Sequence, residues 1–178
     1  MTSKWTAKDI PDLTGRIAIV TGANSGIGYE MARALARKTA TVILACRNED
    51  KGEAAVRQIA REYPETEVEL LQADLADLAS VHRFAEEFTS RYDRLDILIN
   101  NAGIMNTPFG KTADGFELQF GTNHLGHFAL TGLLLEPILG TLLARVVTVS
   151  SWGHHFGVID FDDLHAEKKY DPGRAYAQ

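Results

Sequence analysis

The segment Thr21-Gly22-Ala23-Asn24-Ser25-Gly26-Ile27-Gly28 joins an apolar run at 16–21 to a helical pattern at 26–38. Its glycines allow a tight turn and let backbone N–H groups approach a phosphate closely, while the start of the following helix favours an anion. The spacing G-x-x-x-G-x-G differs from the usual dinucleotide fingerprint, and no Gly-Lys-Ser/Thr follows as in a P-loop. A strand before it and a helix after it favour a dinucleotide site over an ordinary glycine turn.

The rest of the chain alternates short apolar runs with longer helical patterns. In one of the helical patterns, Val81, Phe84, Ala85 and Phe88 recur at helical spacing. We expect strands at 16–21, 41–45, 67–73, 95–100 and 145–150, and helices at 26–38, 49–62, 77–90 and 114–139, the last bent near Gly121 or Asn123. Apolar strands alternating with helices are typical of a parallel sheet covered on both faces. The sequence therefore predicts an α/β fold with a doubly wound parallel sheet, Rossmann-like, in a single domain over residues 1–178.

Composition excludes several classes of protein. The 178 residues are 45% hydrophobic and 24% charged, which is ordinary for a globular domain. The net charge of −6 argues against a nucleic-acid binder, which needs a basic face. No apolar run approaches the roughly 18 residues of a membrane span, and the N-terminus lacks a secretory signal pattern. The single cysteine, Cys46, cannot form an internal disulfide, so we expect a reducing, cytoplasmic setting.

Glycine and polar residues collect where the predicted strands end. Ligands of doubly wound sheets bind beyond the carboxyl ends of the strands, so this placement predicts a ligand site along one edge. The segments concerned are Gly22–Gly28, Cys46-Arg47, Asp74, Asn100–Gly103 and Ser150-Ser151, after the first to the fifth strand respectively.

The end of the second strand indicates which dinucleotide would bind. An acid at this position would bind the ribose 2′-hydroxyl of NAD, but Cys46 stands there and Arg47 follows. A guanidinium can pair with a 2′-phosphate through two hydrogen bonds, so we predict NADP(H) rather than NAD(H). The alternative for Arg47 is a solvated surface charge, and Asn48 is a candidate helix N-cap. The missing acid also argues against a methyltransferase that binds S-adenosylmethionine.

Several motifs, taken in order, resemble the short-chain dehydrogenase/reductase family: Thr21–Gly28, Asn100-Asn101-Ala102-Gly103, Asn123 and Ser151. Within that family, the segments 44–48, 122–128 and 160–164 are similar to the branch of retinol dehydrogenases and protochlorophyllide reductases. The resemblance implies that Asp74 and Leu75 border the adenine ring. It also implies cofactor contacts from Gly22, Asn24, Ser25, Gly26, Ile27, Gly28, Asn101, Ala102 and Gly103.

The same resemblance implies the chemistry, which is hydride transfer between NADP(H) and a carbonyl or alcohol substrate. Such a reaction needs an acid for the developing alkoxide and a dipole that polarises the carbonyl. The family pattern assigns the hydrogen bond to the substrate oxygen to Ser151, with Ser150 as the alternative. It assigns the acid to Tyr176 and a proton relay through water to Asn123. Mixed aromatic and apolar residues at 105–111 and 152–161 favour a hydrophobic substrate.

The chain departs from the family pattern at its end. The family's catalytic lysine would stand two residues beyond Gln178, the last residue of the chain. We therefore expect a C-terminally incomplete domain, lacking the last strands and the substrate segment, and negligible turnover by these 178 residues alone. We also expect no formed helix to fix Tyr176. The alternative function is a truncated NADPH-binding or regulatory protein without catalysis.

Some remaining residues admit more than one interpretation. His124 and His127 are three residues apart, but no carboxylate or cysteine completes a ligand set, so no metal site is predicted. His154 and His155 either border the substrate or are loop residues. The resemblance further implies a homodimer or homotetramer for a longer form of the chain.

Overall fold

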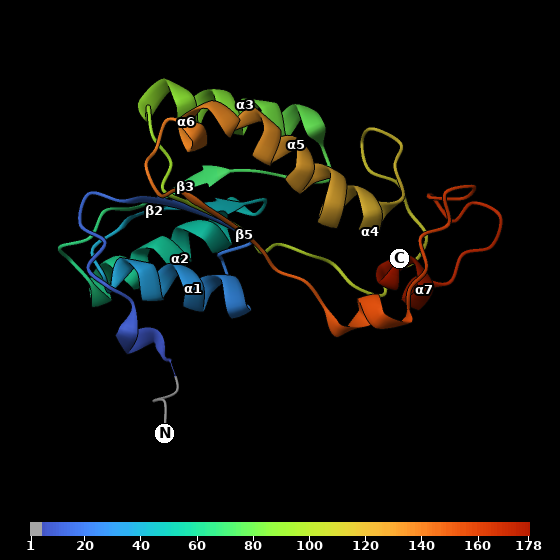
Figure 1. The fold of residues 1–178 in the computed structure, drawn as a ribbon, viewed down its shortest axis with the longest axis horizontal. Coiled ribbons are helices and arrows are strands. Elements are labelled where there is room, and N and C mark those ends of the chain that lie inside the picture. The colour runs from blue at the N-terminus through green and yellow to red at the C-terminus, as the bar shows by residue number, and fades with distance from the viewer. Residues whose placement is uncertain (1–4) are drawn as a thin grey trace.

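A computed structural model describes residues 5–178. Five parallel strands form one sheet in the order β3-β2-β1-β4-β5 (Figure 1). This order places β1 at the centre, with β2 and β4 as its neighbours, and confirms the predicted doubly wound fold. The strands are β1 (Ile17–Thr21), β2 (Thr41–Cys46), β3 (Val68–Gln72), β4 (Ile97–Asn100) and β5 (Arg145–Thr148).

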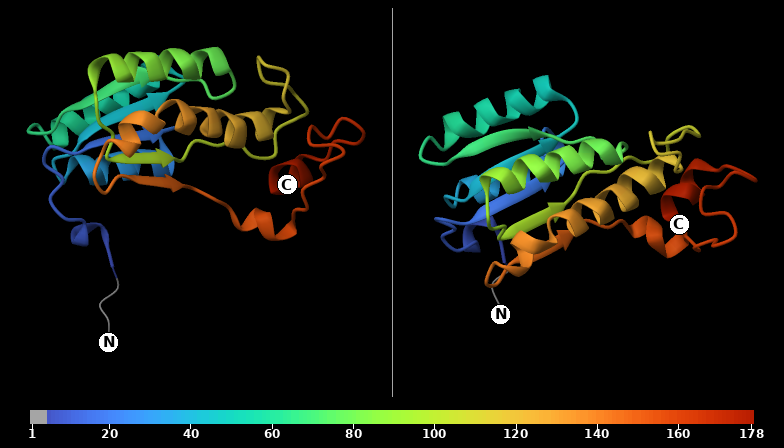
Figure 2. Two further views of the ribbon diagram at one scale, coloured as in Figure 1. Left: turned by 45° about the horizontal axis from the view of Figure 1, so that its top comes forward. Right: turned by 90° about the horizontal axis from the view of Figure 1, so that it is seen from above.

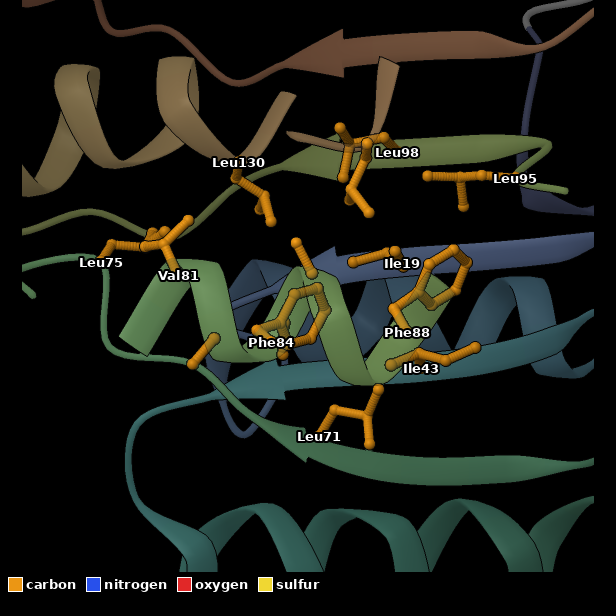
Figure 3. Close-up of a cluster of buried hydrophobic side chains, with 14 of the residues drawn as sticks. Ile19, Ile43, Leu71, Leu75, Val81, Phe84, Phe88, Leu95, Leu98 and Leu130 are labelled. Atoms are coloured by element: carbon orange, nitrogen blue, oxygen red, sulfur yellow. The ribbon is translucent and has the colours of Figure 1, made fainter. Parts of the chain in front are cut away.

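Helices cover both faces of the sheet, and each face has its own apolar core. α1 (Gly26–Ala36) and α2 (Glu49–Glu62) pack on one face, where Val20 and Leu44 are fully buried. α3 (Leu78–Arg91) packs on the other face, where Phe84 and Phe88 lie against strand residues (Figure 3). Side chains alternate between the faces along each strand, which explains why the strands are apolar almost throughout. A short 3₁₀ turn, Ala7–Asp9, precedes β1.

The long helical segment predicted at 114–139 is shorter and broken. It consists of α4 (Leu118–Phe120), a π-helical turn at Gly121–Leu125, α5 (Gly126–Leu133) and α6 (Leu135–Leu139). The expected start at Asp114 was wrong because that carboxylate accepts a hydrogen bond from Leu78 N (3.0 Å) at the start of α3. Glu117 caps α4 instead. The predicted bend near Gly121 or Asn123 is confirmed as the π-helical turn.

The last thirty residues extend beyond the carboxyl end of β5. They contain a 3₁₀ turn, Trp152–Phe156, and a short helix, α7 (Pro172–Ala177), that lies beside α4 (Figure 2). The expectation of no formed helix at Tyr176 was wrong. Asp171 caps α7 by accepting from Arg174 N (2.7 Å), and Pro172 occupies the first helical position, where its missing N–H has no consequence. Between residues 5 and 178, no helix is both long and apolar enough to cross a membrane.

Candidate cofactor and active site

The glycine-rich turn after β1 has no room for side chains at two positions. Gly22 has φ +65°, and a Cβ there would lie 3.0 Å from the Cα of Ala102. A Cβ at Gly28 would lie 2.4 Å from Asn101 Nδ2 and 2.7 Å from Gly22 O. Helix α1 therefore begins in direct contact with the turn, and its first N–H groups face the edge of the sheet without intrahelical partners.

Thr21 fastens this turn to the end of β4. Its Oγ1 accepts hydrogen bonds from Asn101 N and Ala102 N, both at 2.9 Å, and its carbonyl accepts from Asn101 Nδ2 (2.9 Å). The side chain of Asn101, predicted as a cofactor contact, is thus turned to the backbone of β1 and lies under Gly28. These contacts hold the glycine-rich turn against the residues that follow β4.

A cavity of about 350 Å³ lies beyond the carboxyl ends of β1 to β4. It brings together seven of the residues predicted to bind the cofactor: Gly22, Asn24, Arg47, Asp74, Leu75, Ala102 and Gly103. Ser25 lines an adjoining cavity of about 260 Å³ together with Asn24 and Lys51. The other predicted residues, Gly26, Ile27 and Gly28, form the first turn of α1, where Ile27 is 66% exposed.

Two cations stand at the end of β2. Arg47 and Lys51 both line the larger cavity, and neither forms an ion pair within residues 5–178. Asn48 caps α2 by accepting from Lys51 N (2.8 Å), which confirms the predicted N-cap and holds Lys51 in the first turn. The sequence analysis missed Lys51. Its position four residues after Arg47, just inside the predicted helix, is the signal that could have identified it.

The same cavity contains one buried hydroxyl without a partner. Thr122 is 9% exposed, and its Oγ1 has no hydrogen bond to the described part of the chain. A buried polar group without a partner is costly, so Thr122 Oγ1 is a candidate ligand contact that the sequence analysis missed. Cys46, by contrast, is an inert residue beneath the site, because burial raises the pKa of its thiol to about 11.

The predicted catalytic residues lie around the end of α4 and α7. Ser151 Oγ accepts from Gly153 N (3.0 Å). A Cβ at Gly153 would lie 3.1 Å from Tyr176 Cε1 and 3.4 Å from Ser151 Oγ, so the tyrosine ring and the serine hydroxyl both lie close to this glycine. Tyr176 also lines a cavity of about 210 Å³ together with Asn123. The other residues around this cavity are Gln119, Phe120, His124, Ile159, Leu164, Ala175 and Gln178.

Asn123 lies in the π-helical turn, lines the 210 Å³ cavity and is hydrogen-bonded to a residue that lines the larger one. Its Oδ1 accepts from Ile104 N (2.9 Å), and its Nδ2 donates to Ile104 O (2.8 Å). Ile104 lines the larger cavity, and a Cβ at the neighbouring Gly103 would lie 3.5 Å from Asn123 Oδ1. The side-chain amide is therefore occupied by the backbone that follows β4.

His127, buried in α5, joins Asn123 to β1. Its Nδ1 lies 2.8 Å from Asn123 O, an atom that can only accept, so Nδ1 carries the proton. Its Nε2 lies 2.8 Å from Thr21 Oγ1, below the glycine-rich turn. Burial lowers the pKa of His127, which keeps the ring neutral. The sequence analysis considered this histidine only as a metal ligand, because its contact with Thr21 spans 106 residues.

Comparisons with known proteins agree with this geometry. A family model described as short chain dehydrogenase matches residues 16–162. Retinol dehydrogenase 11 of Mus musculus is 51% identical over 164 residues, which are 92% of this chain and 52% of that protein. A solved protein of uncharacterised function from Mycobacterium paratuberculosis is 51% identical, with a TM-score of 0.86, over 98% of this chain and 60% of that one.

A more distant solved structure carries a nucleotide. The active-site complex of Pseudomonas aeruginosa RhlG with NADP is 26% identical to this chain, with a TM-score of 0.72, over 93% of this chain and 62% of that one. The chain spans about half the length of the curated relatives it matches.

Proposed function

The chain belongs to the short-chain dehydrogenase family, and from this premise we propose that it binds NADP(H) and forms the cofactor-binding part of an oxidoreductase acting on a carbonyl or alcohol. The observation that carries this proposal is the cavity at the carboxyl ends of β1 to β4. Its lining combines Gly22 of the glycine-rich turn with two cations, Arg47 and Lys51, that form no ion pair within residues 5–178, and the turn leads directly into α1.

The residues around this cavity fit a phosphorylated dinucleotide. The turn at Gly22–Gly28 would hold the pyrophosphate against the N–H groups of α1. Arg47 and Lys51 would bind the 2′-phosphate of NADP(H). An acidic residue at the end of β2 would instead bind the ribose 2′-hydroxyl of NAD(H), but Cys46 occupies that position. Asp74 and Leu75 would border the adenine. The NADP complex of RhlG, which shares the fold, supports the same choice of cofactor.

The bound cofactor would supply or accept a hydride. The chain's own residues would form a hydrogen bond to the substrate oxygen and transfer its proton. In this proposal Ser151 Oγ donates a hydrogen bond to the substrate oxygen, and the Tyr176 hydroxyl supplies the proton. The approach of both side chains to the Cβ position of Gly153 supports this division. Asn123 holds the backbone at Ile104, and the second proton of its Nδ2 and the second lone pair of its Oδ1 remain for a water that relays the proton.

We propose a hydrophobic alcohol or aldehyde as the substrate. Phe120, Ile159 and Leu164 supply large apolar side chains to the smaller cavity, and its polar residues include Asn123 and Tyr176. Small-molecule sites typically combine apolar side chains with placed polar groups. The similarity to retinol dehydrogenase 11 supports a long apolar alcohol of that kind.

A second candidate is a protein that binds NADPH without turnover. The 350 Å³ cavity is lined entirely by residues 22–122, whereas the Tyr176 hydroxyl forms no hydrogen bond to a lysine or arginine within residues 5–178. The phenol of tyrosine ordinarily has a pKa near 10, so it needs a neighbouring cation to act near neutral pH. This observation favours binding without catalysis for the chain taken alone.

The two candidates are separated by following NADPH oxidation with a panel of apolar aldehydes. In a chain extended by the residues that the family pattern places beyond Gln178, the oxidoreductase proposal predicts turnover that Tyr176→Phe lowers by about a hundredfold or more, with NADPH affinity unchanged. Tyr63→Phe is the matched control and should leave turnover unaffected. Tight NADPH binding without turnover supports the second candidate, and absence of binding to either NADPH or NADH contradicts both.

A further inference from the structure

A buried carboxylate that the proposed reaction does not use lies at the start of α4. Glu117 is 1% exposed. One of its carboxylate oxygens accepts from Gln119 N (3.0 Å) and from the Tyr170 hydroxyl (3.3 Å), and the other accepts from Phe120 N (2.7 Å). Burying a carboxylate is costly unless its oxygens are hydrogen-bonded. Because the Tyr170 hydroxyl is one of the donors to Glu117, losing this contact is unfavourable, and Tyr170 is held in place relative to α4.

Gln119 uses both ends of its side-chain amide to bind two other segments. It is also 1% exposed. Its Oε1 accepts from Asn106 N (2.8 Å), and its Nε2 donates to the Tyr170 hydroxyl (3.0 Å) and to Pro172 O (3.1 Å). One side chain thus ties α4 to the loop after β4 and to the first residue of α7.

The Tyr170 hydroxyl is the point where these segments meet. It accepts from Gln119 and has one proton for two acceptors, Thr107 O at 2.8 Å and the Glu117 carboxylate. Its ring packs edge-on against Phe109, with ring centroids 5.2 Å apart. Three segments that are distant in the sequence are therefore joined at one oxygen.

This cluster of polar side chains lies one helical turn from Tyr176. Pro172 begins α7, and Tyr176 follows four residues later, about 6 Å further along the helix axis. Gln119 and Tyr176 line the same 210 Å³ cavity. Because α7 has only six residues, its own hydrogen bonds hold it weakly, and its placement depends on contacts with neighbouring elements.

We propose that Glu117, Gln119 and Tyr170 are positioning residues that hold the ring of Tyr176 beside Ser151. Anchoring Pro172 fixes the start of α7, and through the helix it fixes the ring over Gly153. The inference rests on the proposed function for what Tyr176 does in the reaction, whereas the positioning itself can be observed without turnover.

The test is fluorine NMR of the protein labelled with 3-fluorotyrosine. The chain has five tyrosines, and Tyr176→Phe assigns the signal of Tyr176. Tyr170→Phe keeps the ring on Phe109 but removes the hydroxyl, and Gln119→Met removes the amide at similar volume. In both variants the Tyr176 signal should move toward that of free 3-fluorotyrosine, while the signals of the tyrosines elsewhere in the fold stay in place.

Tyr92→Phe is the matched control, because it removes a hydroxyl bonded to the Glu69 carboxylate in another part of the molecule. Its Tyr176 signal should not move. An unmoved Tyr176 signal in both Tyr170→Phe and Gln119→Met overturns the inference.

Kinetics separates this inference from the proposed function. If the protein turns over, Tyr170→Phe should lower kcat at least about tenfold with the NADPH Kd unchanged, because misplacement of a catalytic group is costly. An unaffected kcat overturns the inference. A moved signal in a protein without turnover upholds the positioning and counts against the proposed reaction.

Discussion

Gly28 packs against the glycine-rich turn that borders the proposed cofactor cavity. A Cβ at this position would meet the amide of Asn101 and the carbonyl of Gly22, a backbone atom that cannot yield without moving the turn. The proximity also shows why a glycine was required here even though its backbone is helical.

We therefore predict that Gly28→Ala lowers the free energy of unfolding by about 1–3 kcal/mol, as overpacking does, and weakens NADPH binding. Urea unfolding and a fluorescence titration with NADPH measure the two effects. Gly132→Ala is the control, since a Cβ there would meet nothing within 4 Å. That change should leave binding unaltered and stabilise α5 by up to about 1 kcal/mol. Equal behaviour of the two variants would show that the packing at Gly28 is unimportant.

At the same scale, the sequence predicted some residues well and others not at all. Gly22 and Arg47 were predicted because each follows an apolar run whose end is visible in the sequence. Thr122 was missed because its approach to the cavity depends on how its helix lies against the sheet, whereas Lys51 was missed although its place in the first turn of the helix after Arg47 could have indicated it. The hydrogen bonds of Gln119 could not be predicted from the sequence, because its partners are 13 to 53 residues away along the chain.

At the scale of elements, His127 joins α5 and the π-helical turn to the end of β1. Burial lowers the pKa of this histidine below that of an unfolded chain, about 6.5. The unfolded state therefore binds the proton more readily than the folded state. The stability that the neutral ring contributes is present above about pH 6.5 and is lost as the pH falls through the lowered pKa.

His127→Gln should remove this part of the pH dependence. We predict that the free energy of unfolding falls more steeply from about pH 7.5 to about pH 5.5 in the unmodified chain than in the variant, by up to about 1.4 kcal/mol per pH unit. His82→Gln, at an exposed position of α3, is the control and should keep the original slope. If the free energy of unfolding depends on pH in the same way in His127→Gln and in the unmodified chain, the claim that His127 is neutral in the folded state is contradicted.

The bounds of most strands and helices could be predicted from local sequence patterns. The strands and α2 lie within two residues of their predicted bounds, because apolar runs and punctuating polar residues are local signals. The segment 114–117 is not helical, because Asp114 serves as a hydrogen-bond acceptor for α3, 36 residues earlier. No local pattern reveals such a contact. The helix at Tyr176 was likewise underestimated, although Asp171 and Pro172 together form a recognisable helix start.

At the scale of the whole molecule, the two cavities are built by different parts of the chain. The cavity proposed to bind the nucleotide is built by β1 to β4 with the turns and helices that follow them, whereas the smaller cavity is built by α4, the π-helical turn and the last twenty residues. Two hydrogen bonds join Asn123, which lines one cavity, to Ile104, which lines the other. The fold class followed from the alternation of strands and helices, whereas the second cavity depends on long-range polar contacts that only the structure reveals.

The central claim is that Arg47 and Lys51 at the end of β2 select a 2′-phosphate. A fluorescence titration of the unmodified chain with NADPH and with NADH tests it most directly. Hydrogen bonds between charged groups are worth about 1.5–3 kcal/mol, so NADPH should bind at least about tenfold more tightly than NADH. Equal affinities, or tighter binding of NADH, would contradict the assignment of these two cations.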